Sequence, residues 1–395
     1  MEDLGILPNV VTFSGCMGAL ANGSQWRITL QLLSSMKAID VQPNDYTYNA
    51  AIVACSEPGE WEVALHLLTV MRRSLPLDNF SLASAINACA FCAMWQNALS
   101  ILALKPDPGV SCFNACLSVC GKGSRWQHAL QLFDEMRERN MQQDIFSYNS
   151  AISACEKGAR LQEGISFLDN MPSQKVAPDV FSFSTLMSVC EKTGHWELAL
   201  SLLFAMPTKQ VKPNNVSYNA AISACSKGTQ WHRALHLLDA MMVSQLVPDT
   251  ISANAAISAC EESGDWEAAL HLLTVRMCSL RLRRSVIGIS SAISACEKGS
   301  SWAAALQLLR DMPTWRCVAN DITYNSTMKA AERGGHWELV LALLEEMNAS
   351  HVGVDLIAYN TATLACERKL HKNHCMQHLL NEHLPAEVLE AFHPF

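Results

Sequence analysis

Histidine, glutamate and cysteine are the residue types in this chain that could build a catalytic zinc site, and their spacing argues against one. His195–Glu197 and His336–Glu338 match the H-x-E half of the nucleobase-deaminase motif, but no P-C-x-x-C follows either of them. Cys89 and Cys92 form a lone C-x-x-C without the second pair that a structural zinc site needs. Both H-x-E sequences flank a tryptophan at the start of a predicted helix. We therefore expect these His and Glu residues to be part of the helix starts and not to bind a metal.

A second candidate metal cluster lies near the C-terminus. Its members are Cys366, His371, His374, Cys375 and His378. Their spacing fits no standard zinc finger, which favours a frayed helical cap over a metal site. The sequence also lacks a Walker loop, a G-x-S-x-G motif and the clustered acidic residues of a metal-dependent nuclease. We therefore predict that the chain is not an enzyme and uses no metal, cofactor or small-molecule substrate.

The composition bears on whether the chain binds nucleic acid, enters a membrane or carries a targeting peptide. Half of the 395 residues are apolar and the net charge is −8, which is unusual for a nucleic-acid binder taken as a whole, although charge acts locally. No apolar run reaches the length of about 18 residues that a membrane span requires, so no membrane partner is expected. The N-terminal MEDLGILPN has the features of neither a secretory signal nor an organellar transit peptide, so no targeting peptide is visible.

The cysteines recur at a spacing that predicts buried thiols rather than disulfides. One slot of a repeat holds Cys55, Cys89, Cys120, Cys155, Cys190, Cys225, Cys260, Cys296 and Cys366. Neighbouring copies of a stacked helix lie about 8–10 Å apart, which is beyond the usual reach of a disulfide. Cys112, Cys116 and Cys120 line one helix face in the same way, and we expect them in the core.

Self-similarity with a period near 35 residues dominates the sequence and is typical of a solenoid. Ten near-complete units span residues 10–355: 10–44, 45–78, 79–109, 110–144, 145–179, 180–214, 215–249, 250–285, 286–320 and 321–355. Residues 1–9 match the end of a truncated unit, which leaves open an N-terminus further upstream. Residues 356–395 are predicted to form a degenerate final repeat and a C-terminal cap.

Each unit contains two helical patterns. In the unit that starts at Ile145, Tyr148, Ile152 and Cys155 lie on one face of a short first helix, and Gly158 is predicted as its C-cap with a positive φ. A tryptophan, replaced once by Leu161, opens the apolar stripe of each second helix. A proline followed by Asp or Asn closes many units, because proline stops one helix and the polar residue can start the next. The predicted fold is all-α: a right-handed α-solenoid superhelix of stacked helix-turn-helix repeats.

The unit reads V-x-S/T-Y-N-x-x-I-S-A-C-x-K-G-x-x-W-x-x-A-L-x-L-L-x-x-M…V-x-P-D and resembles the pentatricopeptide repeat. It is similar to the tetratricopeptide repeat too, but that repeat has 34 residues and a different first helix. The resemblance covers essentially the whole chain. It implies an α-solenoid that binds single-stranded RNA, one nucleotide per repeat, in mitochondria or plastids. It also implies that the fifth and last residues of each unit select the base.

These two positions carry correlated residue types. The fifth residues are Ser14, Asn49, Ala83, Asn114, Asn149, Ser184, Asn219, Asn254, Ser290 and Asn325. The matching last residues are Asn44, Asp78, Gly109, Asp144, Asp179, Asn214, Asp249, Ser285, Asn320 and Asp355. Eight units carry only Asn with Asp or Ser with Asn, a pattern that indicates a paired code, although duplication of whole units would produce it as well.

Two further positions point to the same face. The thirteenth residue is often a cation that could contact RNA phosphates: Lys122, Lys157, Lys192, Lys227, Lys298, Arg333 and Arg368. The alternative is a solvated cation favoured by the helix dipole, and Glu57, Phe91 and Glu262 interrupt the row. The second residue is mostly apolar and in the family clamps the base faces; the alternative is packing between helices. These residues are Val11, Tyr46, Phe80, Phe146, Phe181, Val216, Ile251, Ile287 and Ile322.

The sequence therefore predicts a sequence-specific single-stranded RNA-binding adaptor that acts in organellar RNA processing, stability or translation, with other RNA-processing proteins as possible partners. By the resemblance, Asn with Asp prefers U and Ser with Asn prefers A, so the units specify the A/U-rich sequence A-U-?-U-U-A-U-?-A-U from 5′ to 3′. The alternatives are a protein-binding scaffold like the tetratricopeptide arrays, and a piece of an RNA-processing enzyme.

Overall fold

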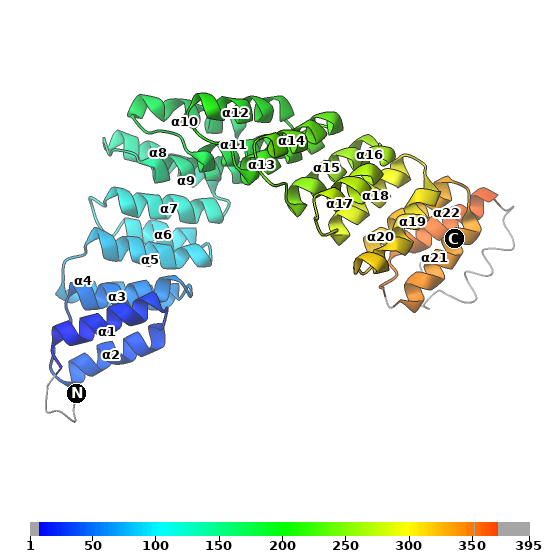
Figure 1. Ribbon diagram of the computed structural model, residues 1–395. Coiled ribbons are helices and arrows are strands. Elements are labelled where there is room, and N and C mark those ends of the chain that lie inside the picture. The colour runs from blue at the N-terminus through cyan, green and yellow to red at the C-terminus, as the bar shows by residue number, and fades with distance from the viewer. Residues whose placement is uncertain (1–7, 351, 370–395) are drawn as a thin grey trace, which may run out of the picture. The chain divides into compact units, whose positions relative to one another are not determined.

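The computed structural model describes residues 8–350 and 352–369. All regular secondary-structure elements in these ranges are helices, and no strand occurs in them (Figure 1). The chain divides into an N-terminal body, residues 1–193 and 208–211, and a C-terminal body, residues 194–207 and 212–395. Each body is a stack of paired helices that follow the sequence units; in the unit 180–214 the first helix belongs to the N-terminal body and residues 194–207 belong to the C-terminal body. The predicted all-α solenoid class is therefore confirmed.

The first helices of successive units begin directly after the last residue of the preceding unit. In the N-terminal body they are α1 (Val10–Asn22), α3 (Asp45–Ser56), α5 (Asn79–Phe91), α7 (Val110–Lys122), α9 (Ile145–Gly158) and α11 (Val180–Thr193). In the C-terminal body they are α13 (Asn215–Lys227), α15 (Thr250–Ser263), α18 (Val286–Lys298), α20 (Asp321–Arg333) and α22 (Leu356–Lys369). Within each body every first helix packs on the first helix of the next unit, so these helices form one continuous layer.

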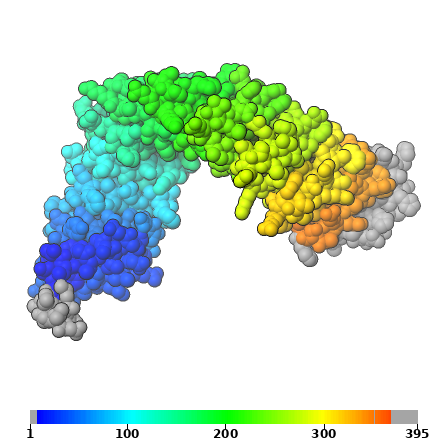
Figure 2. Space-filling view, viewed as in Figure 1, coloured from blue at the N-terminus to red at the C-terminus, as the bar shows by residue number. Residues whose placement is uncertain are grey.

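The second helices begin at the repeated tryptophan, as predicted, or at Leu161. They are α2 (Trp26–Ala38), α4 (Trp61–Ser74), α6 (Trp95–Leu102), α8 (Trp126–Glu138), α10 (Leu161–Asn170), α12 (Trp196–Thr208), α14 (Trp231–Val243), α16 (Trp266–His271), α19 (Trp302–Asp311) and α21 (Trp337–Ala349). Most of them contact the first helix of their own unit and that of the next one. Side chains fill the spaces between successive pairs within each body (Figure 2).

The buried face of each hairpin follows the predicted periodicity. Ile152 and Cys155 of α9 are fully buried, and Tyr148 is 3% exposed. From the second helix of the preceding unit, Ala129 and Met136 are fully buried. Burying apolar side chains of this size stabilises a fold by about 1.5–3 kcal/mol each. One hairpin cannot cover its own stripe, and the stability of the stack therefore depends on contacts between neighbouring units.

Each first helix is capped by the last residue of the unit before it. Asn44, Asp144 and Asn320 have extended backbone and accept a hydrogen bond from the amide three residues later, at 3.0, 2.9 and 3.1 Å. Such a cap is worth about 1 kcal/mol. At five helix starts the side chain of the third helical residue also accepts a hydrogen bond from the backbone amide of the cap and completes a capping box. The Asp or Asn that ends one unit is thus the start signal of the next helix, whether or not a proline precedes it.

The predicted role of Gly158 as a left-handed C-cap is wrong. The left-handed residue is Ala159, with φ 51°, and Gly158 is the last residue of α9. A Cβ atom on Gly158 would lie 2.5 Å from Cγ of Trp126 in the preceding unit. Gly228 and Gly299 meet Trp196 and Trp266 at similarly short distances. Glycine is used here because the indole of one unit packs directly on the helix end of the next.

Three units depart from the common length of 35 residues: 45–78 has 34, 79–109 has 31 and 250–285 has 36, and the differences lie after the first helix. The unit 79–109 is short, and its α6 has only 8 residues. The unit 250–285 carries an extra residue, and α16 continues through the π-helix Leu272–Arg276 into α17 (Met277–Ser279). A π-turn takes one more residue per hydrogen-bonded ring than an α-turn. The first helices, which carry the candidate site, keep their regular geometry in both units.

Candidate nucleic-acid interface

The fifth and last residues of the Asn–Asp units lie side by side and are hydrogen-bonded to each other. Asn Nδ2 donates to the Asp carboxylate at 3.2 Å in Asn49–Asp78, 3.0 Å in Asn114–Asp144, 3.3 Å in Asn149–Asp179, 3.3 Å in Asn219–Asp249 and 3.1 Å in Asn325–Asp355. Residues about 30 positions apart are thus brought into one polar pair per unit. Asn254 and Ser285 form a pair of the same kind, with Nδ2 donating to the hydroxyl at 2.9 Å.

The aspartate of each pair serves two partners at once. Oδ1 of Asp78 accepts the capping hydrogen bond from the Ser81 amide at 2.9 Å, while Oδ2 accepts from Asn49. Burial raises the pKa of the Asp78 carboxyl, but the hydrogen bonds from Ser81 and Asn49 outweigh burial and hold the pKa below its usual value. The carboxylate is therefore ionised at neutral pH and acts only as an acceptor.

The amide oxygen of the fifth residue has different surroundings in different units. The Ser147 hydroxyl donates to Oδ1 of Asn114 at 2.6 Å, and the Ser182 hydroxyl donates to Oδ1 of Asn149 at the same distance. Among the described residues, the buried Oδ1 atoms of Asn49, Asn219 and Asn325 have no hydrogen-bond partner. In every Asn–Asp pair the side-chain amide is thus oriented with its N–H groups toward the carboxylate.

The serines of the Ser–Asn units are arranged differently. The hydroxyls of Ser14, Ser184 and Ser290 donate to the backbone carbonyl four residues earlier, at 2.6, 2.5 and 2.7 Å. Because the hydroxyl proton is used within the helix, the oxygen can only accept from a further partner. The matching Asn44, Asn214 and Asn320 cap the next helix through Oδ1, which leaves their amide N–H groups as donors.

The unit 79–109 offers no polar pair. Ala83 and Gly109 bring no hydrogen-bonding side chain, and Gly109 caps α7 without a side-chain contact. The side chain of Asn79 lies against Gly109, at 2.5 Å from where a Cβ atom would be, and accepts a hydrogen bond from Lys105 at 2.7 Å. The unit keeps its place in the stack while losing the polar groups at the fifth and last positions.

The apolar second residues are exposed, which argues against the packing interpretation. Phe146 is 69% and Phe181 is 55% exposed. The row continues with Val11, Tyr46, Phe80, Val216, Ile251, Ile287 and Ile322, all more than half exposed. Nine of the ten units thus carry a large apolar side chain in solvent at this position, with Ser111 in the unit 110–144, and such a row marks a surface available to a ligand.

Polar pairs and apolar residues line common grooves in the N-terminal body. A groove of about 440 Å³, the central groove, is lined by Phe146, Phe181, Asn149, Asp179 and the lysines described below. Another of about 610 Å³ is lined by Tyr46, Phe80 and Asn49. In each case two second-position side chains border a fifth-position asparagine. Such a groove can hold a flat ring between two apolar side chains, with hydrogen-bonding groups at its edge.

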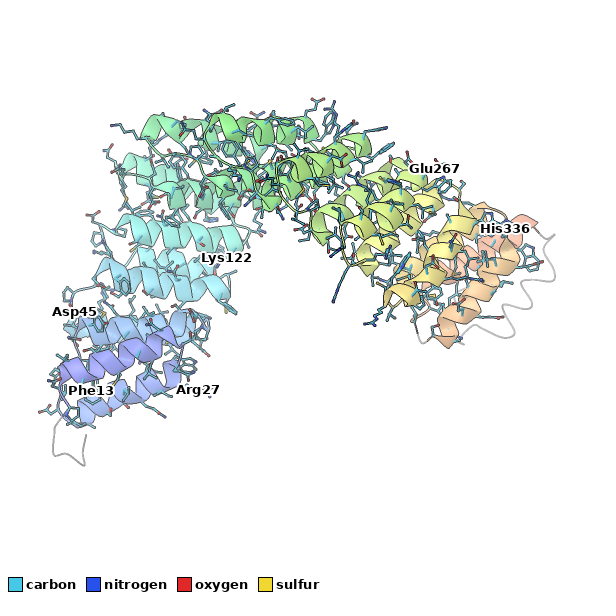
Figure 3. All side chains as sticks on the ribbon, in the orientation of Figure 1. Phe13, Arg27, Asp45, Lys122, Glu267 and His336 are labelled. Carbon is cyan, nitrogen blue, oxygen red and sulfur yellow. The ribbon has the colours of Figure 1, made fainter. Side chains whose placement is uncertain are left out.

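The cations of the thirteenth position fall into two groups. Lys122, at the C-terminal end of α7 (Figure 3), and Lys157 line the central groove. Lys192, Lys298 and Arg333 instead form ion pairs with Glu156, Glu262 and Glu297 of the preceding unit, at 2.8, 3.3 and 3.3 Å. Lys227 is exposed at the end of α13. The side chain of Arg368 lies outside the described part of the chain.

The helix-dipole interpretation holds for two of these cations. Lys192 donates to the backbone carbonyl of Glu156 at 3.3 Å, and Arg333 donates to that of Glu297 at 3.0 Å. Both carbonyls are near the C-terminal end of a first helix, where cations are favourable. The sequence reasoning missed the glutamates. The signal was present as a glutamate in the twelfth position, about 36 residues before each cation.

The residues that suggested a metal have other roles in the structure. No group of three or more His, Cys, Asp or Glu side chains that could hold a metal ion occurs within residues 8–350 and 352–369. His336 packs against Trp302 in a tilted arrangement, with a ring-centroid distance of 4.1 Å. The predicted burial of the cysteines is confirmed for Cys155, Cys190, Cys260 and Cys296, and burial raises the pKa of each thiol to about 12. His371, His374, Cys375 and His378 lie outside the described residues.

In the described part of the chain, no helix is both long and apolar enough to cross a bilayer.

Three family models match the sequence, and they agree. The "PPR repeat family" model matches residues 108–157, 143–192 and 178–227, the "Pentatricopeptide repeat domain" model matches residues 1–58, and the "PPR repeat" model matches residues 216–246 and 322–352. Together they cover more than half of the chain. Tandem helical hairpins with this repeat define a helical-repeat protein, and the chain belongs to the pentatricopeptide repeat family.

Solved structures are similar to this chain, and one of them has a TM-score above 0.5 and shares the fold. The pentatricopeptide repeat protein PPR10 from maize has a TM-score of 0.60 at 16% identity, over 97% of this chain and 60% of the maize chain. At this identity the likeness concerns the fold alone, and the chain spans 60% of the length of that relative. PPR10 in complex with an 18-nt psaJ RNA element has a TM-score of 0.47 at 23% identity, over 91% of this chain and 52% of that one. Yeast Rmd9p in complex with a 16-nt target RNA has a TM-score of 0.41 at 10% identity, over 91% and 85%. No curated protein sequence matches the chain.

Proposed function

We propose that this protein is a sequence-specific single-stranded RNA-binding adaptor that reads one nucleotide per repeat. The observation that carries the proposal is the recurring pairing of the fifth and last residues beside grooves bordered by exposed apolar side chains. Membership of the pentatricopeptide repeat family supports it. A groove for a peptide would not require the hydrogen-bonded polar pair that recurs at one fixed register in six units.

The Asn–Asp pairs are suited to uracil. Uracil presents an N3–H donor between two carbonyl acceptors. The carboxylate of an aspartate such as Asp179 can accept from N3–H, while the Asn149 amide can donate to a neighbouring carbonyl. Cytosine and adenine present a lone pair where uracil has N3–H, and a carboxylate repels it. The resemblance to the family's code and this chemistry both favour U at the Asn–Asp units.

The Ser–Asn pairs are assigned to adenine. The Ser14 hydroxyl, whose proton is used within α1, can accept from the N6 amino group, and the Asn44 amide can donate to N1. The proposed target is therefore A-U-?-U-U-A-U-?-A-U, with the third unit indifferent to the base. In this proposal residues 10–355 are the ten reading units, 1–9 and 356–395 are partial repeats, and the RNA-contacting cations are those of the thirteenth position.

The proposal extends to the setting of the protein. Family resemblance supports a location in mitochondria or plastids, where the protein would occupy a transcript non-enzymatically and affect processing, stability or translation. Occupying single-stranded bases excludes nucleases and competing RNA structure, and an adaptor of this kind can also position other RNA-processing proteins.

The first test is fluorescence-anisotropy binding to labelled AUNUUAUNAU RNA, its shuffled version and the corresponding DNA, over a salt series. The proposal predicts selective binding to the designed RNA, with log K falling as log salt rises by about 0.7 per phosphate contact. Equal affinity for the shuffled RNA would contradict base selection by the polar pairs. Absence of RNA binding at low salt by the folded protein would contradict the proposed RNA-binding function.

A substitution in the central groove tests whether RNA binds there. Phe146→Ala is expected to weaken RNA binding by about 5- to 150-fold, because stacking of a base on an aromatic ring is worth ~1–3 kcal/mol. Val243→Ala, an 86% exposed apolar residue at the end of α14, is the matched control and should leave affinity unchanged. Equal effects of the two variants would contradict the groove as the base-binding site.

A further inference from the structure

Three cations of the thirteenth position, Lys192, Lys298 and Arg333, are ion-paired with a glutamate 36 residues earlier in the chain. Lys192 and Arg333 follow units whose twelfth residue is glutamate, Glu156 and Glu297. The units before Lys122 and Lys157 have Ala90 and Gly121 at the twelfth position, and the thirteenth residues Phe91 and Lys122 provide no acid either. Among the described residues, neither Lys122 nor Lys157 makes an ion pair.

The paired glutamates differ in how strongly they hold their cations. The side chains of Glu156 and Glu297 are 21% and 14% exposed, so each carboxylate depends on its cation and would be left poorly solvated without it. Glu262 and Lys298 are 42% and 40% exposed, and such a surface pair is weak. A phosphate that approaches Lys192 or Arg333 must displace a carboxylate first, whereas a phosphate at Lys122 or Lys157 displaces only water.

The two unpaired lysines also coincide with a base-binding groove. Lys122 and Lys157 belong to adjacent first helices, α7 and α9, and both line the central groove between Phe146 and Phe181. Asn149 and Asp179, one of the polar pairs, line the same groove. Uncompensated positive charge and a complete set of base contacts therefore meet at one place in the N-terminal body.

From these observations, and resting on the proposed RNA-binding function, we propose that Lys122 and Lys157 supply the phosphate contacts at the central groove. Glu156 and Glu297 act as internal competitors of RNA phosphate. They withdraw Lys192 and Arg333 from the backbone-binding row. The central groove is then an electrostatic anchor of the complex, and the units of Lys192 and Arg333 contribute base selection with little backbone affinity.

The loss-of-charge test compares Lys122→Gln and Lys157→Gln with Lys175→Gln. Lys175 is an exposed lysine after α10 in the same body, and it carries the same charge change away from the groove. Each groove variant should reduce the slope of log K against log salt by about 0.7 and the affinity at 0.1 M salt by about fivefold. Lys175→Gln should do neither.

The gain-of-charge test uses the competitor. Glu156→Gln frees Lys192 and should tighten RNA binding about fivefold at 0.1 M salt, with the slope steeper by about 0.7. Lys192→Gln should then weaken binding more in the Glu156→Gln background than in the wild-type chain. Helical circular dichroism and a thermal melt confirm that each variant is folded.

The outcomes separate this inference from the proposed function. Wild-type protein that binds no RNA overturns both. RNA binding that Lys175→Gln weakens as much as Lys157→Gln, or that Glu156→Gln leaves unchanged, overturns the inference and leaves the RNA-binding proposal standing. Tighter binding by Glu156→Gln together with selective loss in the two groove variants supports it.

Discussion

The aspartate that ends each Asn–Asp unit holds two partners, and both tasks depend on the same carboxylate. Asp179 accepts the Ser182 amide at 2.9 Å as the cap of α11 and the Asn149 amide at 3.3 Å as half of the candidate reading pair. A substitution at this position therefore tests base preference alone only if the new residue still caps the following helix. Asparagine and aspartate cap helices equally well, which makes their exchange informative.

Asp179→Asn is expected to shift base preference at the fifth nucleotide. Replacing the carboxylate by an amide supplies a donor for N3 of cytosine and weakens the acceptor for N3–H of uracil. The preference for U over C should fall by about tenfold, which corresponds to ~1.4 kcal/mol. Anisotropy with RNAs that carry U or C at that nucleotide measures it.

Two further measurements control this variant. The thermal midpoint should stay close to that of the wild type, because the cap is retained. Changing the second nucleotide, assigned to Asn49 and Asp78, should affect Asp179→Asn and the wild type equally. An unchanged U-to-C ratio at the fifth nucleotide in a folded variant would show that Asp179 serves the helix alone.

At the scale of the element, contacts between a second helix and the helix end of the next unit set the stacking distance. The indole of Trp126 lies where a side chain at residue 158 would be, and the Arg160 guanidinium lies 4.7 Å above the ring. Gly158 gives the closest approach, while the left-handed turn falls on Ala159.

Gly158→Ala should therefore destabilise the fold by ~1–3 kcal/mol, the usual effect of overpacking a tight contact. Gly15→Ala is the matched comparison, because Gly15 is inside α1 and no neighbouring element comes within 4 Å of where its Cβ atom would lie. The added helix propensity at Gly15 should stabilise by up to ~1 kcal/mol. Chemical denaturation of both variants measures the difference. Equal stabilities would contradict the steric role of Trp126.

Element positions were predictable because periodicity depends on neighbours in sequence. The tryptophan register, the apolar faces and the proline followed by Asp or Asn located both helices of nearly every unit. Features that depend on the next unit were not predictable from one unit's pattern. Gly158 was misassigned for this reason, and the partners of Lys192 and Arg333 were missed. The polar pairs could be proposed from correlated residue types, but their hydrogen bonds required the packing of adjacent first helices.

At the scale of the whole molecule, the buried thiols make the free energy of unfolding decrease at alkaline pH. The pKa of Cys155, Cys190, Cys260 and Cys296 is about 12 in the folded chain against an ordinary value of 9.0, because burial disfavours the thiolate. Below pH 9 the thiols are neutral in both states, so their contribution to stability is complete. As pH rises from 9 towards 12 the unfolded state ionises first, and the folded state loses stability.

At pH 10 the free energy of unfolding should be lower by about 1.4 kcal/mol for each of these thiols than at pH 8. Denaturation at the two pH values measures the sum, and Cys155→Ala should reduce the pH effect by the share of one thiol. A native chain whose Cys155 reacts with a thiol reagent as quickly as exposed Cys278 would contradict the burial argument.

The capping role of the last residue has a consequence for how such a protein changes its target. The residues that start the described first helices are Asn9, Asn44, Asp78, Gly109, Asp144, Asp179, Asn214, Asp249, Ser285, Asn320 and Asp355. All belong to the few amino acids that begin helices well. Evolution or engineering can change the recognised RNA sequence without destabilising the fold only by exchanging residues of this small set. Most other substitutions at the last position would weaken the helix that it caps. The requirement for helix capping therefore limits the base preferences that this position can acquire.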